Sequence, residues 1–250
     1  MVKFFSAFSA SLRCILAGLL DTGMIFQLNF DKPRPARVSE EKWRIYNNRY
    51  NKARFRETAC HLKPASLLEV GCEYGVLGYL LDGTLNYVGL DVDKESVEIS
   101  RSMGNLTYVG SAFDLPFPDS SYDNVVLEET LEHCGHAEVV IKEAYRVLAP
   151  GGVLVLSIPA KGKMRRNPDH HYFYKFKAMK SLITNAGFRI IKAFVLMKLF
   201  SFYVAVKPED SYVPTRLIIP MELHTKKTLA GRLFRRFWRS FVYLEGRLKS

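Results

Sequence analysis

Acidic residues and glycines follow two apolar runs of the chain in a pattern that suits a nucleoside ligand. Glu69 and Gly71 end the run LLEVG, and Gly75 stands at the start of an expected helix. Glycines let a backbone turn approach a ligand closely. Asp91 ends the next apolar run, 20 residues after Gly71, where a carboxylate can accept hydrogen bonds from both hydroxyls of a ribose. The spacing therefore predicts a site for a nucleoside-containing cofactor.

Two cofactor classes share this layout, the nicotinamide dinucleotides and S-adenosylmethionine. A dinucleotide site typically has the pattern Gly-x-Gly-x-x-Gly, in which backbone N–H groups hold a pyrophosphate. Glu73 stands where the second glycine would be. Its carboxylate would repel a pyrophosphate, whereas beside a sulfonium or an ammonium group it is neutral or favourable. Glu73 therefore disfavours NAD.

Alternating strands and helices are expected to position these residues. The expected strands are Ser66–Val70, Tyr87–Asp91, Leu106–Val109, Tyr122–Leu127 and Val153–Ile158, followed by two apolar runs, Phe188–Met197 and Leu199–Val206. The expected helices cover residues 40–60, Gly75–Leu81, Lys94–Met103, 136–149 and a stretch near 175–186. This alternation predicts an α/β fold with a mostly parallel sheet and helices on both faces.

Charge is unevenly distributed along the chain. The 250 residues are 48% hydrophobic and 24% charged, which is typical of a globular protein, and they carry a net charge of +11. Residues 1–58 contribute +6, residues 59–208 contribute 0, and residues 209–250 contribute +5. We therefore expect a neutral central domain, 59–208, between two basic flanks whose partner surface is negative, either an anionic membrane or a nucleic acid.

Both flanks have the pattern of an amphipathic helix. Apolar residues recur at helical spacing from Phe4 to Leu19, but no uncharged run there approaches the roughly 18 residues of a spanning helix. A helix on the core or on a bilayer surface is therefore favoured over a cleavable signal peptide. The tail 225–250 places leucines and phenylalanines on one side and arginines opposite. This pattern is typical of a helix that binds a membrane surface or a partner, or docks on the sheet.

The cysteines and histidines do not predict a metal site. Four cysteines are scattered without a Cys-x-x-Cys pair, so neither a disulfide framework nor a zinc ribbon is expected, and a reducing cytoplasm is the default compartment. His133, Cys134 and His136 lie close in sequence. Side chains of adjacent residues at a helix start point apart, however, and no fourth ligand is evident. No metal is therefore expected.

Several segments together resemble the class I S-adenosylmethionine-dependent methyltransferases, in particular their type 11 group. LLEVGCEYG is similar to the first motif of that family, YVGLDVD to its ribose-binding strand end, and GSAFDLPFPDSSYDNVVLEETLEH to its adenine loop and fourth strand. RVLAPGGVLVLSIP is similar to its helix, turn and fifth strand, and AGFRIIKAFVLM and LFSFYVAVKP to its last two strands. The resemblance covers roughly residues 60–208. It implies a Rossmann-like, doubly wound seven-stranded sheet, here with N- and C-terminal helical extensions.

The resemblance also implies S-adenosylmethionine as the methyl donor and a set of residues that bind it. Glu69, Gly71, Cys72 and Gly75 would line its methionine end, Asp91 and Val92 would contact the ribose and adenine, Ser111, Ala112 and Phe113 would contact the adenine ring, and Glu128 would face the methionine part. Two residues depart from the family pattern. Glu73 replaces a frequent glycine, and Ser111 replaces an acid that commonly binds the adenine amino group. Neither departure removes the site.

Methyl transfer is an in-line displacement at a sulfonium, so the protein must mainly align the acceptor and exclude water. A base is needed only where the acceptor carries a proton. His133, His170 and His171 are candidate bases because the fold would place them near the carboxyl ends of the strands. For His133 the alternative is a helix-start residue bonded to the backbone.

The predicted acceptor is a small molecule, lipid-like or membrane-associated and reached from the cytosolic face, because both flanks are apolar and basic. Nucleic-acid methylation, of RNA in particular, is the first alternative and is suggested by the tail segment RLFRRFWRSF. Against it, the fourth strand ends in LEET instead of the [ND]-P-P-[YFW] of many base-amino methyltransferases, and the central domain has no net positive charge. A non-catalytic protein that binds S-adenosylmethionine is the second alternative.

Overall fold

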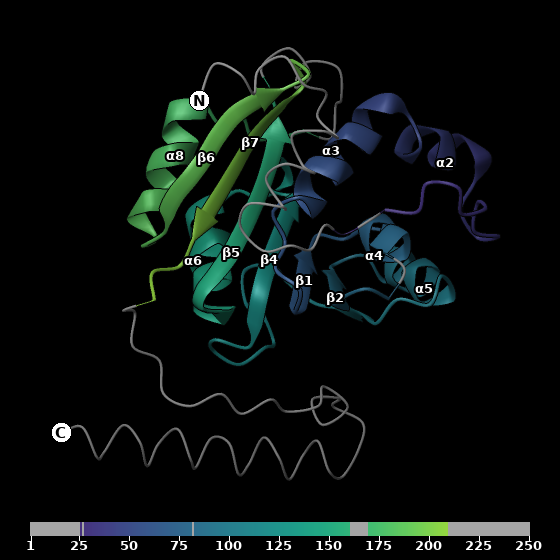
Figure 1. Ribbon diagram of the computed structural model, residues 1–250, viewed down its shortest axis with the longest axis horizontal. Coiled ribbons are helices and arrows are strands. Elements are labelled where there is room, and N and C mark those ends of the chain that lie inside the picture. Colours follow the sequence, from purple (N-terminus) through teal and green to yellow (C-terminus); the bar gives the residue numbers. More distant parts are fainter. Residues whose placement is uncertain (1–25, 27, 82, 161–169, 210–250) are drawn as a thin grey trace, which may run out of the picture. The chain divides into compact units, whose positions relative to one another are not determined.

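The computed structural model describes Phe26 and residues 28–81, 83–160 and 170–209. They contain a seven-stranded sheet in the order β3-β2-β1-β4-β5-β7-β6 (Figure 1). The strands are β1 (Ser66–Val70), β2 (Asn86–Asp91), β3 (Thr107–Val109), β4 (Tyr122–Glu128), β5 (Leu148–Pro159), β6 (Arg189–Leu196) and β7 (Phe200–Val206). Neighbouring strands from β3 to β5 are parallel, whereas β7 is antiparallel to both β5 and β6. The expected Rossmann-like sheet is confirmed.

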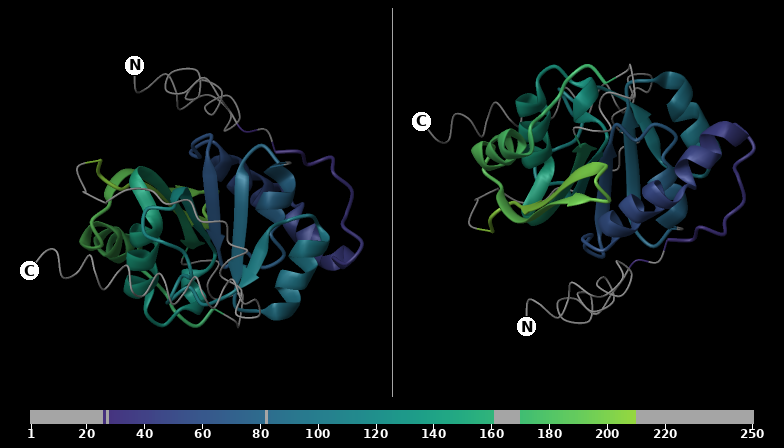
Figure 2. Two further views of the ribbon diagram at one scale, coloured as in Figure 1. Left: turned by 90° about the horizontal axis from the view of Figure 1, so that it is seen from below. Right: turned by 90° about the horizontal axis from the view of Figure 1, so that it is seen from above.

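Helices accompany both halves of the sheet. They are α2 (Glu40–Tyr46), α3 (Arg49–Ala59), α4 (Val76–Leu81), α5 (Lys94–Ser102), the 3-10 turn η2 (Leu131–His133), α6 (Ala137–Val147) and α8 (Phe176–Asn185). α4 and α5 contact β2 and β3, whereas α6 and α8 contact each other and the strands β5, β6 and β7. Both views in Figure 2 show this division, with the purple and blue helices beside β1 to β3 and the green α8 beside β6 and β7.

The central strands are buried on both faces, and this places the acidic residues of the chain at one edge. Leu67 of β1 and Val126 of β4 pack with Phe55 of α3 and Leu77 of α4 in one core cluster. Successive strand side chains point to opposite faces, and Leu68, the next residue of β1, is also fully buried. Because β1, β2 and β4 are parallel, the acids at their carboxyl ends lie along the same edge of the sheet.

The segment that leads into the sheet forms two helices, so the single helix expected over residues 40–60 is wrong. α2 begins after Ser39, whose side chain caps its first turn. α3 begins after Asn48, whose side-chain oxygen accepts hydrogen bonds from the N–H groups of Tyr50 and Asn51 at 2.8 and 2.9 Å. Asparagine is among the strongest N-cap residues. It therefore starts a new helix where helical periodicity alone predicted continuation.

The predicted N-terminal helix and the basic tail 225–250 lie outside the described residues. Their helices, and the domain boundaries at residues 58 and 208, stay predictions. Within the described part of the chain, no helix combines the length and the apolar character that crossing a bilayer requires. Of the three described cysteines, Cys60 takes part in a disulfide, and Cys72 and Cys134 are free thiols.

Candidate functional site

The turn between β1 and α4 is packed tightly between β2 and the end of β4. The N–H groups of Gly71 and Cys72 both donate to the carbonyl of Leu90, at 2.8 and 3.2 Å. Thr130, just beyond β4, donates its hydroxyl to the carbonyl of Val70 at 3.0 Å. The Thr130 methyl carbon lies 2.5 Å from the place that a Cβ on Gly71 would take, and Gly71 has a φ of 73°. Only glycine therefore fits at position 71.

Gly71→Ala should destabilise the protein more than Gly83→Ala. Both glycines have a φ of 73°, so an alanine at either position costs about 1–2 kcal/mol in this left-handed region. A Cβ on Gly83 would meet no atom within 4 Å, whereas one on Gly71 would overlap Thr130, which should add about 1–3 kcal/mol. Urea unfolding of the two variants measures the difference. Equal free energies of unfolding would contradict the packing described for the turn.

Glu73, which stands in place of the expected glycine, joins this turn to α2. Its N–H donates to Asp91 Oδ2 at 2.7 Å. Its carboxylate accepts a hydrogen bond from the Tyr46 hydroxyl and forms an ion pair with Lys42 Nζ at 2.6 Å. Burial and the adjacent Glu73 carboxylate raise the pKa of Tyr46 far above its ordinary value, so the hydroxyl remains a donor. The departure from the family pattern at position 73 thus has a structural role.

Asp91 lies at the carboxyl end of β2, where the sequence placed it. Its Oδ2 accepts the bond from Glu73, and its Oδ1 accepts one from the N–H of Asp93 at 2.9 Å. A carboxylate offers about four lone-pair sites. Bonds from two ribose hydroxyls can therefore be added to the two that already fix the carboxylate.

The predicted adenine-binding residues lie beside the end of β2. The N–H of Gly110 donates to the carbonyl of Asp91 at 2.9 Å, and Ser111 Oγ accepts a hydrogen bond from the N–H of Phe113 at 3.1 Å. Val92 is 78% exposed and Phe113 is 42% exposed, while Ala112 is partly buried. A flat adenine ring could pack against these two exposed apolar side chains, as the family resemblance implies.

Glu69 is buried below the turn, and its Oε2 accepts a hydrogen bond from the Tyr87 hydroxyl at 2.6 Å. Burial raises the pKa of Glu69 to about 8; the Glu128 and Asp91 carboxylates add to the increase, and the Tyr87 hydrogen bond and Arg54 oppose it. A cation placed next to Glu69 would favour its ionised form. The carboxyl group is therefore suited to a positively charged ligand.

Glu128 is buried at the end of β4 and is held from α3. The Thr58 hydroxyl donates to its Oε1, and Arg54 Nε lies 3.4 Å from its Oε2. Burial lowers the pKa of Arg54, but four surrounding carboxylates outweigh burial and raise it: those of Glu128, Glu129, Glu69 and Glu132. Among the residues that the structure describes, acidic side chains gather at this edge of the sheet, which suits a sulfonium or ammonium ligand.

Arg54→Met should lower the free energy of unfolding by about 3–5 kcal/mol, because breaking a buried ion pair leaves a buried charge uncompensated. Arg44→Met is a matched control. Arg44 is 77% exposed and pairs with Glu40 on the surface of α2 at 2.6 Å, and such exposed pairs contribute about 0–1 kcal/mol. Chemical denaturation of both variants measures the two losses of unfolding free energy. A loss for Arg54→Met as small as that for Arg44→Met would contradict a structural role for the Arg54 pair.

Two of the three predicted catalytic histidines come together in the structure. The rings of His133, in η2, and His170 have centroids 5.3 Å apart and planes at 73°. His170 Nε2 also lies 3.9 Å from Glu132 Oε1. His171 is exposed, and its backbone N–H donates to the Glu132 carbonyl at 3.1 Å. Because η2 follows the end of β4, His133 and His170 lie near the edge that carries the acids.

Six residues that hold this site were not singled out from the sequence. They are Tyr46, Arg54, Thr58, Tyr87, Thr130 and Glu132. Tyr87, Thr130 and Glu132 lie within the motif segments, so their positions were available in the sequence. Arg54 and Thr58 are four residues apart and so share one face of α3, whereas Tyr46 reaches the site through tertiary packing.

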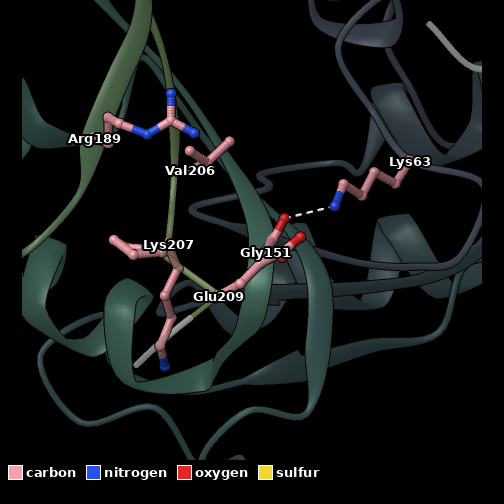
Figure 3. Close-up of a pocket in the computed structure, with 7 residues that line it drawn as sticks. Lys63, Gly151, Arg189, Val206, Lys207 and Glu209 are labelled. Carbon is pink, nitrogen blue, oxygen red and sulfur yellow. Dashed lines mark hydrogen bonds between the residues drawn. The ribbon is translucent and has the colours of Figure 1, made fainter. Parts of the chain in front are cut away.

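A basic hollow lies at the opposite end of the parallel strands (Figure 3). It is lined by Lys63, Gly151, Arg189, Val206, Lys207, Pro208 and Glu209. Lys63 Nζ donates to the Gly151 carbonyl at 2.6 Å, and Lys207 Nζ donates to the carbonyls of Tyr145 and Leu148 at 2.9 and 2.8 Å. These two ammonium groups serve the fold. The hollow is separate from the acidic edge and is not part of the candidate site.

The fold and the matched family agree. A solved S-adenosylmethionine-dependent methyltransferase from Thermotoga maritima shares the fold with a TM-score of 0.58 at 20% identity, over 67% of this chain and 94% of that one. Residues 68–156, which include Glu69, Asp91 and Glu128, match the family model described as "Methyltransferase domain". Residues 68–156 therefore form a methyltransferase domain, and the described residues have the fold of class I methyltransferases. S-adenosylmethionine is the methyl donor that this family and fold use.

Two relatives of the methyltransferase domain have names that refer to lipids. The first is a phthiotriol/phenolphthiotriol dimycocerosates methyltransferase of Mycobacterium ulcerans, 35% identical over 128 residues, which are 47% of this chain and 45% of the relative. The second is a fatty-acid O-methyltransferase of Mycolicibacterium smegmatis, 33% identical over 114 residues, which are 42% of each chain. The chain spans less than half the length of these two relatives, so the similarity concerns the methyltransferase domain.

The described residues fit S-adenosylmethionine. The turn at Gly71 leaves no room for a side chain, so a ligand there could approach the backbone closely. Glu69 and Glu128 are buried carboxyl groups that would suit the sulfonium and ammonium, and Asp91 has lone pairs that would suit the ribose. Cys72 is buried, and its thiol donates to the carbonyl of Glu73 at 3.7 Å. Burial also raises the pKa of the Cys72 thiol well above its ordinary value, so Cys72 can contribute packing and its backbone, but no thiolate.

Proposed function

We propose that the protein transfers a methyl group from S-adenosylmethionine to a lipid-like small molecule. The observation that carries the proposal is the buried acidic edge formed by Glu69 and Glu128 beside Asp91, which suits a ligand with a sulfonium, an ammonium and a ribose. The names of the two relatives support an acceptor with an apolar chain.

Exposed aromatic side chains next to the histidines also support an apolar acceptor. Tyr172 is 43% exposed and Phe173 is 44% exposed. The N–H of Tyr172 donates to the carbonyl of Glu132 at 2.9 Å, so this segment is held beside η2. Ligand sites are lined mainly by apolar and aromatic side chains with a few polar groups, and these two aromatics would contact the apolar part of the acceptor.

The residues of the chain bind, orient and shield the reactants. When bound, S-adenosylmethionine supplies an electrophilic methyl carbon. Asp91 fixes the ribose, and Glu69 and Glu128 hold the positively charged end. For such a displacement the protein mainly has to align the acceptor with the methyl carbon and exclude water. His133 and His170 are placed to take up a proton where the acceptor carries one.

Transfer of a labelled methyl group to defined acceptors tests the proposal. The purified full-length chain is incubated with methyl-labelled S-adenosylmethionine and, separately, with long-chain fatty acids, phenolic lipids or RNA. We expect label in a lipid product and no label with Asp91→Ala. Label in RNA alone would establish the nucleic-acid alternative. Cofactor binding without transfer to any of these acceptors would favour the non-catalytic alternative.

We also propose that the basic flanks hold the enzyme at an anionic membrane on the cytosolic face. The support is the net charge of +6 in residues 1–58 and +5 in residues 209–250, since each cationic residue near an anionic surface contributes about 1 kcal/mol. Sedimentation with phosphatidylserine vesicles, compared with neutral phosphatidylcholine vesicles, tests this. Equal binding to both, or binding to neither, would contradict the proposal.

A further inference from the structure

Glu132, His133 and His170 converge next to the acidic edge. One carboxylate oxygen and one nitrogen from each ring lie within 4.8 Å of one another. Glu132 is only 1% exposed, and its Oε1 lies 3.9 Å from His170 Nε2. The two rings meet edge to face at 73°, an arrangement in which ring nitrogens can point to a common centre. From the sequence, His133 was grouped with Cys134 and His136, and it was not grouped with Glu132 and His170.

Backbone hydrogen bonds fix the two chain segments that carry the three residues. The carbonyl of Glu132 accepts from the N–H groups of His171 and Tyr172 at 3.1 and 2.9 Å. The Tyr174 hydroxyl donates to the carbonyl of Cys134 at 2.8 Å. Neither ring takes part in these bonds, so the imidazoles are positioned by the scaffold around them. Sites of defined geometry require such support.

The electrostatics of this edge favour a further cation. The Glu132 carboxylate is one of the four that raise the pKa of Arg54, together with those of Glu128, Glu129 and Glu69. Buried carboxylates are stable when they are paired or when they coordinate a metal. A divalent ion beside Glu132 would add a favourable interaction to this group of acids.

We propose that Glu132, His133 and His170 bind one divalent transition-metal ion, with Zn²⁺ as the reference ion. Imidazole nitrogens and a carboxylate oxygen are ordinary ligands of Zn²⁺, at about 2.0–2.2 Å, and of Fe²⁺ and Mn²⁺. Ligand atoms within 4.8 Å of one another need only small side-chain rotations to reach such distances. Three protein ligands leave a coordination position open, as in sites where a metal binds a substrate.

The open position gives the metal a role that rests on the proposed function. η2 follows β4, whose last residue, Glu128, is one of the predicted donor-binding residues. A metal held by η2 and His170 would bind an oxygen of the acceptor, either a carboxylate or a hydroxyl whose proton passes to water, and would orient it toward the methyl donor. With the ion bound, the two ring nitrogens that coordinate it would not act as bases, so the metal takes the place of the proton-accepting role proposed above. This extends the proposed function by assigning the acceptor an oxygen-bearing group.

Titration of the untagged full-length chain with Co²⁺, followed by its visible absorbance and by competition with Zn²⁺, tests the site directly. We expect one ion per chain, and an affinity that falls by at least about 10-fold in Glu132→Gln and in His170→Ala, since even supporting residues of a metal site change affinity by about 10–100-fold. His136→Ala is the matched control. His136 Nδ1 lies 3.2 Å from Glu138 Oε1, outside the cluster. The metal affinity of His136→Ala should therefore equal that of the wild type.

Each variant is also titrated with S-adenosylmethionine, because retained cofactor binding shows that the fold is intact. Absence of a stoichiometric ion in a wild-type protein that binds the cofactor would overturn the proposal. Equal metal affinity in wild type, Glu132→Gln and His170→Ala would overturn it as well. Metal binding without methyl transfer would contradict only the proposed function, whereas transfer unaffected by a chelator that strips the ion would refute the acceptor-orienting role.

Discussion

Asp91→Ala should bind S-adenosylmethionine at least about 100-fold more weakly than the wild-type protein. Hydrogen bonds to a charged group contribute about 1.5–3 kcal/mol each, so losing two bonds to the ribose hydroxyls costs about 3 kcal/mol or more, and every 1.4 kcal/mol is tenfold in affinity. The variant also loses the bond from the N–H of Glu73, which holds the turn after β1. Calorimetric titration measures the affinity, and thermal unfolding checks that the variant is folded.

Asp93→Asn is the matched control for Asp91→Ala. Asp93 lies two residues further along and caps α5 by accepting a hydrogen bond from the N–H of Ser96 at 2.9 Å. Asparagine caps a helix as well as aspartate does, so this variant removes a negative charge near the site without altering the helix. Its affinity should stay close to that of the wild type. A loss as large as that of Asp91→Ala would mean that general charge, and not hydrogen bonding by Asp91, holds the cofactor.

Cofactor affinity should rise as the pH increases from 6 to 7.5, because Glu69 must lose a proton to face a cation. Burial raises the pKa of Glu69 to about 8, so the carboxyl group is mostly protonated in the free protein over this range. A sulfonium or ammonium nearby favours the ionised form, and binding should therefore release a proton. Calorimetry in buffers of different ionisation enthalpy counts that proton. The pH range is kept below about 7.7, because the α-amino group of the cofactor's methionine part begins to titrate there.

Glu69→Gln should remove this pH dependence and bind the cofactor weakly at every pH. The same variant tests the pKa through stability. In the wild type, Glu69 titrates near 8 when folded and near 4.5 when unfolded, so the folded state holds the extra proton between these values. The stability contributed by protonated Glu69 is complete below pH 4.5 and is lost as the pH rises through 8. Glu69→Gln should thus be more stable than the wild type at pH 9, and lower stability there would contradict the raised pKa.

The strands could be predicted because a sheet covered on both faces requires continuous apolar runs. Ser66–Val70 is found with the expected bounds, and the acid that follows each run lies at the predicted edge. Helix boundaries were harder to predict. Asn48 interrupts the segment 40–60 through a side-chain cap, a local competition with the helix backbone that periodicity does not reveal.

The partners of the site residues could not be predicted, because they are distant in sequence. Thr58 contacts Glu128 across 70 positions, and Tyr46 contacts Glu73 across 27. Single-sequence patterns describe neighbours on one helix or strand, and nothing in them indicates which distant hydroxyl reaches which carboxylate. The convergence of Glu132 with His170 is of the same kind, since it depends on how two separate segments meet.

The contact of Glu73 with Tyr46 and Lys42 has a consequence for how these positions can vary. Residues that share one hydrogen-bonding group do not contribute additively to stability. Replacing Glu73 by glycine would restore the common motif, but it would leave the Tyr46 hydroxyl and the Lys42 ammonium without the carboxylate that now joins them to the turn. We expect the three positions to be epistatic, so that the effect of a glycine at position 73 depends on the residues at positions 42 and 46.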